Sequence, residues 1–271
     1  MIGVFDSGIG GLSVLKALRA ELPSEDFIYI ADSGHAPYGE RDDRHVIERS
    51  QRITGWLAGQ GIQALVIACN TASAAAIAQL RATHPLLPII GVEPALKPAA
   101  VLSQTKRIGV MATRGTLASG KFRALLATQS SQADFVLQPC DGLADAIERS
   151  AASGNDDEVL ASCARHVNAM GPFGSKPGDI DTLVLGCTHY PFAQACLQQL
   201  VGPDVQIIGN GEAIARQTRR QLREVPDEKN ASSLRQAGTV QLFATGEAAN
   251  LHAAAHRWLG LPVRAPELVD W

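Results

Sequence analysis

The chain has 271 residues, with 24 Lys and Arg against 27 Asp and Glu and a net charge of −3. This length favours one large domain or two of moderate size, and the ordinary apolar fraction is typical of a soluble globular protein. Because no long basic run occurs, the sequence argues against a nucleic-acid-binding protein, and we expect no nucleic-acid partner.

Short apolar runs rich in β-branched residues alternate with longer helical patterns along the chain. Such runs are typical of strands covered on both faces, and their alternation with helices predicts an α/β fold with mainly parallel, doubly wound sheets. One helix is expected between 42 and 61, where Val46, Ile53 and Leu57 share a face, and another near Glu247. The expected strands cover residues 2–5, 27–31, 64–68, 88–92, 107–112, 134–138, 182–186, 205–208 and 240–246.

Two of these strands recur in the same order. The run 2–5 resembles 108–111, and the run 65–68 before Cys69 resembles 183–186 before Cys187. The recurrence predicts two similar α/β halves with the active site at their interface. We expect the first half at 1–97, the second at 98–207, and part of 208–271 packed back on the first half. The polar segment 224–238 is expected to be an exposed loop or linker.

The cysteines and the apolar segments bear on location. There are five cysteines, and none of them form a Cys-x-x-Cys pair, which indicates free thiols in a reducing compartment. The start of the chain lacks the pattern of a signal peptide. The most apolar stretch, 64–80, is broken by Asn70, Thr71 and Ser73, so we expect no membrane span. The protein is therefore expected to be cytoplasmic.

Polar residues follow several strands at their carboxyl ends, where open parallel sheets bind ligands. Both Cys69 and Cys187 precede a predicted helix, whose positive N-terminal dipole favours a thiolate. Cys140, Cys163 and Cys196 lack this setting and are expected to be structural, as most buried cysteines are. The residues that the rule selects are Asp6, Ser7, Pro37, Tyr38, Gly39, Cys69, Asn70, Thr71, Cys187, Thr188 and His189.

Some of these polar residues have simpler alternative roles. Asp6 is also suited to a turn or a helix cap, because aspartate favours both. Tyr38 and His189 lie beside Pro37 and Pro191, so each could merely shape a turn. The sequence alone leaves these alternatives open.

Two thiols at matched positions of similar halves suit racemisation. One base removes a proton from a tetrahedral carbon, and an acid on the opposite face returns one, with the two roles exchanging between directions. A thiol with an ordinary pKa of about 8.5 can be tuned to either role. No lysine stands out as the Schiff-base partner of a pyridoxal cofactor, so we expect the protein to use no cofactor. Oriented donors such as Asn70, Thr71 and Thr188 would then stabilise the carbanion-like state.

Four ordered motifs carry a family resemblance. DSGIGGLSVL from Asp6, PYGER from Pro37, ACNTAS from Ala68 and GCTHYP from Gly186 together resemble the signatures of the Asp/Glu racemase family, in particular its glutamate racemases. The resemblance implies a two-domain enzyme that interconverts L- and D-glutamate without a cofactor or metal. It also implies supply of D-glutamate for peptidoglycan, and such racemases often form homodimers.

The same resemblance implies roles for individual residues. Cys69 would act on D-glutamate with help from Asp6, and Cys187 on L-glutamate with help from His189. Glu148 aligns best with a further family glutamate near the second cysteine, although its surroundings, CDGLADAIERS, differ from the family's more apolar and proline-rich pattern. The implied substrate-binding residues are Asp6, Ser7, Pro37, Tyr38, Gly39, Asn70, Thr71, Thr113, Thr116, Thr188 and His189.

Three other functions share parts of this sequence pattern. Aspartate racemase is the main alternative, but its second motif usually reads GCTE rather than GCTH. A related decarboxylase typically keeps one of the two cysteines. An amino-acid sensor would have no use for paired thiols.

Two short patterns also suggest other kinds of site. A dinucleotide site is suggested by Gly8, Gly10 and Asp32, but Ser13 stands where a third glycine belongs. A metal site at His252 and His256 lacks an evident third ligand.

Overall fold

The computed structural model describes residues 1–223, 237–260 and 264–270, so most of the expected loop 224–238 lies outside the described residues. The chain divides into two compact units, one formed by Met1–Val92 with Gly211–Trp271 and the other by Glu93–Asn210. The sequence placed the first break after residue 97. Helix α4 (Leu96–Leu102) spans that position and packs with β7 (Thr182–Gly186) and α6 (Gly120–Gln129) of the second unit, so the chain changes units before this helix begins.

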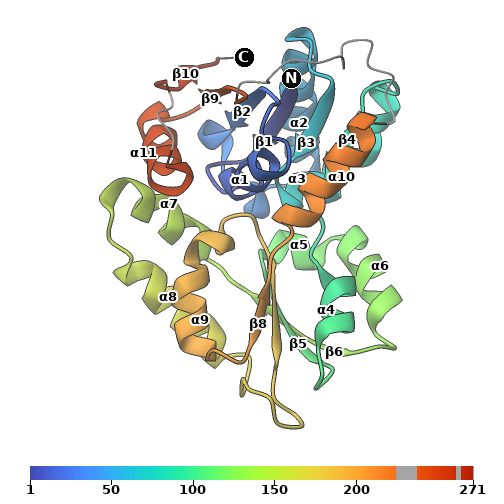
Figure 1. The fold of residues 1–271 in the computed structure, drawn as a ribbon, viewed down its shortest axis with the longest axis vertical. Helices are drawn as coiled ribbons and strands as arrows, with labels where there is room; N and C mark the ends of the chain where they lie inside the picture. Colours follow the sequence, from blue (N-terminus) through green and yellow to red (C-terminus); the bar gives the residue numbers. More distant parts are fainter. Residues whose placement is uncertain (224–236, 261–263, 271) are drawn as a thin grey trace. The chain divides into compact units, whose positions relative to one another are not determined.

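The first unit is built on a six-stranded sheet with the order β10-β9-β2-β1-β3-β4 (Figure 1). Every pairing between these described strands is parallel. Strand β9 returns from the end of the chain to pair with β2, so part of the C-terminal segment completes this sheet. The strands are β1 (Ile2–Asp6), β2 (Phe27–Ala31), β3 (Ala64–Ile67), β4 (Ile89–Gly91), β9 (Val240–Ala244) and β10 (Glu267–Leu268).

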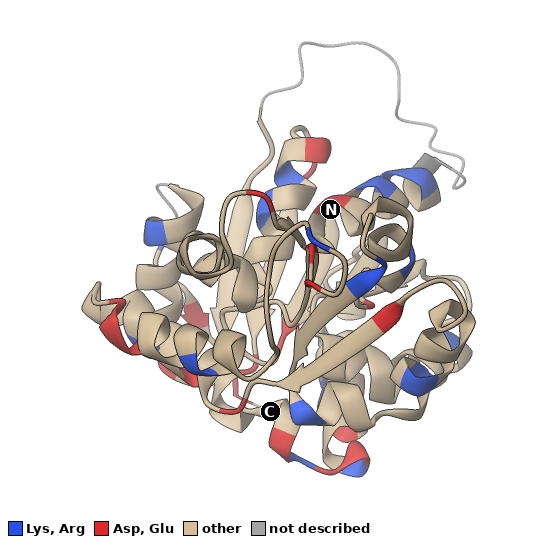
Figure 2. Ribbon diagram, turned by 90° about the horizontal axis from the view of Figure 1, so that it is seen from below, with Lys and Arg blue, Asp and Glu red and all other residues tan. Residues whose placement is uncertain are grey.

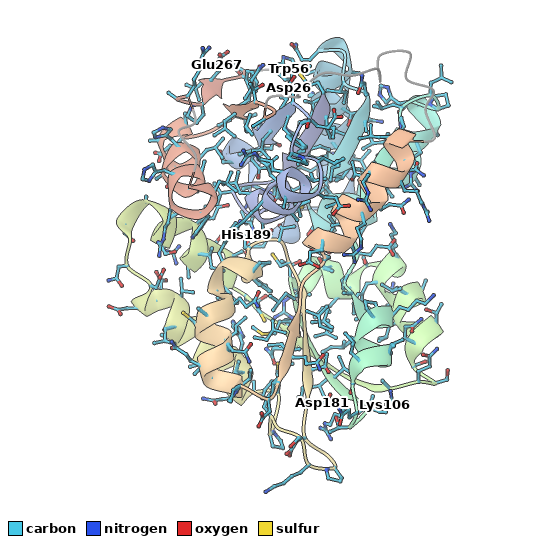
Figure 3. All side chains as sticks on the ribbon, viewed as in Figure 1. Asp26, Trp56, Lys106, Asp181, His189 and Glu267 are labelled. Carbon is cyan, nitrogen blue, oxygen red and sulfur yellow. The ribbon has the colours of Figure 1, made fainter. Side chains whose placement is uncertain are left out.

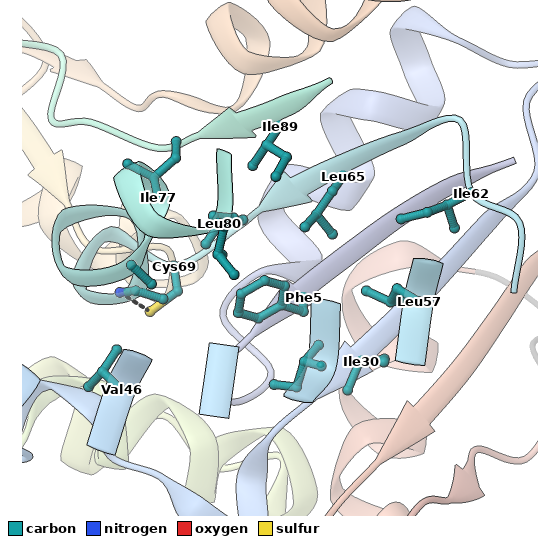
Figure 4. Close-up of a cluster of buried hydrophobic side chains, with 14 of the residues drawn as sticks. Phe5, Ile30, Val46, Leu57, Ile62, Leu65, Cys69, Ile77, Leu80 and Ile89 are labelled. Atoms are coloured by element: carbon teal, nitrogen blue, oxygen red, sulfur yellow. Dashed lines mark hydrogen bonds between the residues drawn. The ribbon is translucent and has the colours of Figure 1, made fainter. Parts of the chain in front are cut away.

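Helices cover both faces of this sheet. Alternate strand residues point to opposite faces, and Phe5, Ile30 and Leu65 join one buried cluster with residues of α2 and α3 (Figure 4). The intervening residues, such as Val4 and Val66, are also fully buried, on the side where α10 contacts β3 and β4 and α11 contacts β9. The elements are α1 (Leu12–Glu21), η1 (Ser33–His35), η2 (Tyr38–Glu40), α2 (Asp43–Gly59), α3 (Asn70–Thr83), α10 (Gly211–Arg223) and α11 (Ala248–Leu259).

The second unit contains a four-stranded parallel sheet with the order β6-β5-β7-β8. Ile108 and Val184 of this sheet form a core with Leu96 of α4 and Phe122 of α6. The strands are β5 (Arg107–Ala112), β6 (Asp134–Pro139), β7 (Thr182–Gly186) and β8 (Gln206–Ile208). The remaining helices are α5 (Arg114–Ala118), α6 (Gly120–Gln129), α7 (Leu143–Ser153), α8 (Asp157–Asn168), η3 (Tyr190–Ala193) and α9 (Gln194–Val201).

The two sheets repeat the same arrangement. The order β2-β1-β3-β4 corresponds to β6-β5-β7-β8, and Gly3 opposes Leu65 as Gly109 opposes Leu183. Cys69 follows Leu65, and Cys187 follows Leu183, by the same number of residues. The predicted fold class, two similar α/β sets with parallel sheets, is confirmed.

Charged residues of both signs are spread over the helices. Figure 2 shows segments of Lys and Arg interspersed with segments of Asp and Glu. Pairs such as Arg149 with Glu158 and Arg219 with Glu21 join opposite charges at the surface. Such exposed pairs contribute little to stability, typically about 0–1 kcal/mol each, so the buried cores carry the fold.

Candidate active site

Cys69 lies between strand β3 and helix α3, where its side chain caps the helix. The sulfur accepts a hydrogen bond from the backbone N–H of Ala72 at 3.5 Å, and the thiol reaches the Ser7 hydroxyl at 3.8 Å. Ser7 in turn donates to the Asp6 carboxylate through its backbone N–H at 2.6 Å and its hydroxyl at 3.1 Å. Asp6 is fully buried, so a carboxylate, a hydroxyl and a thiol form a chain away from bulk water.

Asn70, the first residue of α3, has an unusual polar environment. Its side-chain nitrogen and oxygen are both buried and have no hydrogen-bond partner among the described residues. Leaving a buried polar group unpaired costs about 1–3 kcal/mol. A ligand that offers a donor and an acceptor would offset this cost, so Asn70 is suited to bind a substrate. Thr71, beside it, is half-buried.

The expected loop 37–39 brings one side chain into the same region. Tyr38 is buried in one cluster with Cys69, whereas Pro37 is exposed and Gly39 is half-buried. The Tyr38 hydroxyl donates a hydrogen bond to the Asp32 carboxylate at 2.5 Å. Burial, followed by the charge of Asp32, raises the pKa of Tyr38, so the phenol keeps its proton.

The Asp32 cluster is a feature that sequence reasoning missed. Arg49 on α2 binds the Asp32 carboxylate through both Nε (3.0 Å) and Nη2 (2.8 Å), and Thr245 donates to it at 2.7 Å. The sequence drew attention to Asp32 only as a possible ribose ligand in a dinucleotide site. Its oxygens are instead occupied by protein donors. A useful signal was Arg49 itself, a charged residue within the buried stripe of a predicted helix.

Cys187 directly follows β7 in the second unit, and His189 lies two positions on (Figure 3). The Cys187 sulfur is 3.7 Å from Nδ1 of His189, and Nε2 of the same ring is 2.8 Å from the Glu148 carboxylate on α7. A thiol, an imidazole and a carboxylate therefore form a continuous chain.

Electrostatics define the state of His189 in this chain. Burial by itself would lower the pKa of His189, but the hydrogen bonds to Cys187 and Glu148 outweigh it and raise the pKa well above its ordinary value. The protonated ring is therefore favoured. The ring cation therefore lies within 3.7 Å of the Cys187 sulfur.

The threonines of the second unit differ in their surroundings. Thr113 caps α5 by accepting a hydrogen bond from the Thr116 N–H at 3.2 Å, and its hydroxyl donates to the Thr116 hydroxyl at 2.9 Å. These contacts are those of an ordinary helix cap. Thr188 is buried between Cys187 and His189.

The remaining cysteines occupy apolar positions. All five cysteines are free thiols. Burial raises the pKa of Cys163 to about 12, and burial followed by the neighbouring Cys187 raises the pKa of Cys140. Thiols with raised pKa values stay protonated and are poor bases, so these two residues fit a structural role.

Two further features concern the described residues alone. They contain no group of three or more His, Cys, Asp or Glu side chains placed to hold a metal ion, and His252 and His256 are both exposed on α11. Within the same part of the chain, no helix is both long enough and apolar enough to cross a membrane.

Residues 2–218 match the family model described as Asp/Glu/Hydantoin racemase. The chain belongs to this family. Among the family's glutamate racemases, that of Ectopseudomonas mendocina is 49% identical over 222 residues, which cover 82% of this chain and 81% of the relative.

Solved structures of racemases also resemble the structure of this chain. The structure of Escherichia coli glutamate racemase in complex with L-glutamate and the activator UDP-MurNAc-Ala matches with a TM-score of 0.85 and 29% identity, over 99% of this chain and 97% of that one. An aspartate racemase from Picrophilus torridus matches with a TM-score of 0.51 and 14% identity, over 82% of this chain and 94% of that one. The latter likeness concerns the fold alone.

Proposed function

We propose that this chain is a glutamate racemase, which interconverts L- and D-glutamate by a two-base mechanism without a cofactor. The observation that carries the mechanism is the repeated strand register, which places Cys69 and Cys187 at the same point of two similar sheets. The choice of glutamate over aspartate is supported by the 49% identity to a glutamate racemase over 82% of this chain.

The chemistry transfers one proton on each side of the α-carbon. With D-glutamate, the Cys69 thiolate removes the α-proton and becomes a thiol, while the Cys187 thiol protonates the opposite face and becomes a thiolate. With L-glutamate, the same steps run in reverse. Each turnover leaves the enzyme with the two protonation states exchanged, so the thiols must exchange protons with solvent before the same direction is repeated.

Each thiol has its own supporting groups. In the first unit, the Asp6 carboxylate acts through the Ser7 hydroxyl, 3.8 Å from the Cys69 sulfur. In the second, Glu148 favours the protonated form of His189, which stabilises the Cys187 thiolate and supplies a proton when that thiolate must become a thiol. These links connect each sulfur to groups that can accept a proton from it or return one to it.

The deprotonated α-carbon needs stabilisation, because an amino-acid α-proton is far less acidic than a thiol. The negative charge delocalises into the α-carboxylate, which can accept hydrogen bonds from buried donors. Asn70 has an unpaired buried amide suited to this task, and Thr71, next to it in the sequence, offers a hydroxyl group. In the second unit, the hydroxyl of Thr188 is the corresponding donor. Donors that are fixed before the reaction act most effectively in a dry site.

Incubation of L-glutamate with the enzyme in heavy water tests the mechanism. At early times the D-glutamate product should carry an α-deuterium, while the remaining L-glutamate keeps its hydrogen, because the acid and the base are different groups. The enantiomers are separated and analysed by mass spectrometry. Equal labelling of both enantiomers would support a single base instead, and no labelling would indicate a binding protein.

A substrate panel tests the specificity. The circular dichroism of L-glutamate should decay to zero, while that of L-aspartate should persist. If the signal of L-aspartate decayed faster than that of L-glutamate, aspartate would be the substrate instead. In the cell, the D-glutamate would serve peptidoglycan synthesis, and the free thiols support a cytoplasmic location. A homodimer, expected from the family, would be detected by light scattering.

A further inference from the structure

Asp32 joins four separate segments of the first unit. It directly follows β2, and its carboxylate accepts hydrogen bonds from Arg49 on α2, from Tyr38 in η2 and from Thr245 just after β9. His35 in η1 approaches the same carboxylate at 3.1 Å. Thr245 reaches this point because β9 pairs beside β2, with Ala31 opposite Ala244.

The cluster fixes the loop that carries Tyr38. Thr245 also accepts a hydrogen bond from the Gly34 N–H at 3.2 Å, at the beginning of the connection from β2 to Tyr38. The backbone fits closely there, since a Cβ on Gly34 would lie 2.5 Å from the Thr245 carbonyl oxygen. The loop is therefore held at its start by the Thr245 hydroxyl, which binds the Gly34 N–H, and at Tyr38 by the Asp32 carboxylate.

The cluster keeps Asp32 charged although the side chain is fully buried. Burial alone would raise the pKa of Asp32, but the hydrogen bonds from Arg49, Tyr38 and Thr245 outweigh it and lower the pKa. An ionised acceptor forms stronger hydrogen bonds than a neutral one, so the Tyr38 hydroxyl is held firmly.

We propose that Asp32 is a positioning residue, which uses Arg49 and Thr245 to fix Tyr38 and the loop 37–39 next to Cys69. Tyr38 and Cys69 share one buried cluster, so a shift of the ring would alter the surroundings of the thiol. Asp32 itself acts through Tyr38 rather than on the substrate. The kinetic part of this role rests on the proposed racemase function, because it requires glutamate to bind at this loop.

Thr245→Val is the sharpest test, because it removes one hydroxyl while keeping a side chain of similar size. Thr245 also lies outside the proposed catalytic and binding residues. Thr245→Ser, which keeps the hydroxyl, is the matched control. We expect Thr245→Val to raise the KM for glutamate about tenfold, the size expected for one hydrogen bond to a charged group, with a much smaller change in kcat. Thr245→Ser should behave like the parent enzyme.

Two further measurements separate positioning from a merely structural role. The alkylation rate of Cys69 should rise severalfold in Thr245→Val, while that of Cys187, in the other unit, should stay unchanged. In a Tyr38→Phe background, Thr245→Val should raise KM by less than it does in the parent enzyme, because the link through Asp32 is already broken and only the hydrogen bond from the Gly34 N–H remains to be lost.

A lower melting temperature with unchanged KM and unchanged Cys69 alkylation would overturn the proposal, and so would full additivity with Tyr38→Phe. If the parent enzyme failed to racemise glutamate, the proposed function would fall, but the alkylation comparison would still decide whether Asp32 positions this loop.

Discussion

Cys69 and Cys187 occupy the same place in two similar sheets, yet their neighbours differ in kind. Cys69 contacts a hydroxyl backed by a carboxylate, Ser7 and Asp6, whereas Cys187 contacts an imidazole backed by the carboxylate of Glu148. The backbone arrangement is therefore repeated while the proton-handling groups are not.

The register of the two units explains how this difference arises. Asp6 ends β1 in the first unit, and the corresponding residue of β5 in the second is Ala112, as their pairings with β2 and β6 show. Thr71 similarly stands where the second unit has His189. The residue that supports the thiol therefore lies at the end of β1 in the first unit and after β7 in the second. A symmetric scaffold can therefore serve a reaction whose two directions use chemically different bases.

The largest expected effect concerns the thiols themselves. Cys69→Ser and Cys187→Ser should each reduce racemisation by about 10³-fold or more, because a hydroxyl is a far weaker acid than a thiol. Cys196→Ser, the same change at a helical thiol outside the site, should retain activity. The rates are followed by circular dichroism with both enantiomers, and near-normal turnover in either variant would rule out the two-base scheme.

Intermediate effects are expected at Asp6 and His189, the residues that support the two thiols. Asp6→Asn and His189→Asn should each lower kcat on the order of tenfold to hundredfold. The ratio of kcat for the two directions should shift oppositely in the two variants, because each residue supports a different thiol. The values of kcat/KM must remain equal for both directions, since enantiomers have an equilibrium constant of one. If the ratio of kcat for the two directions shifted the same way in both variants, Asp6 and His189 would not support different thiols.

The smallest effect concerns Glu148 and the pH dependence of stability. Because the pKa of His189 is raised in the folded state, its stabilisation is complete below the unfolded pKa of about 6.5 and is lost as pH rises through the folded value. Glu148→Gln should lower the melting temperature by about 2–4 °C near pH 6 and by less at higher pH. Glu158→Gln, at an exposed partner of Arg149, is the control. A pH-independent loss would show that Glu148 does not act through His189.

Much of the architecture could be predicted from local patterns. The β-branched runs marked nine of the ten strands described, while β10, which contains the polar Glu267, gave no such signal. The repeated strands also indicated the position of both cysteines, because the carboxyl ends of parallel strands are where side chains gather. Glu148 was selected only through the family resemblance, and the structure places its carboxylate 2.8 Å from His189.

The Asp32 cluster could not be predicted in this way. Its donors come from residues 38, 49 and 245, and nothing in helical or strand periodicity indicates that these positions meet. Thr113 and Thr116 were selected as substrate-binding residues from their place after an echoed strand, and the structure adds that they hydrogen-bond to each other at the start of α5. Their part in substrate binding stays a prediction.

The order of synthesis gives the discontinuous first unit a particular folding history. The second unit, Glu93–Asn210, is continuous and its synthesis is complete before β9 is made. Until then β2 is an unprotected sheet edge, with backbone groups open to pairing with other chains. The arrival of β9 closes that edge and delivers Thr245 in one step, so a nascent chain that stops short of residue 245 lacks the final clamp on Asp32.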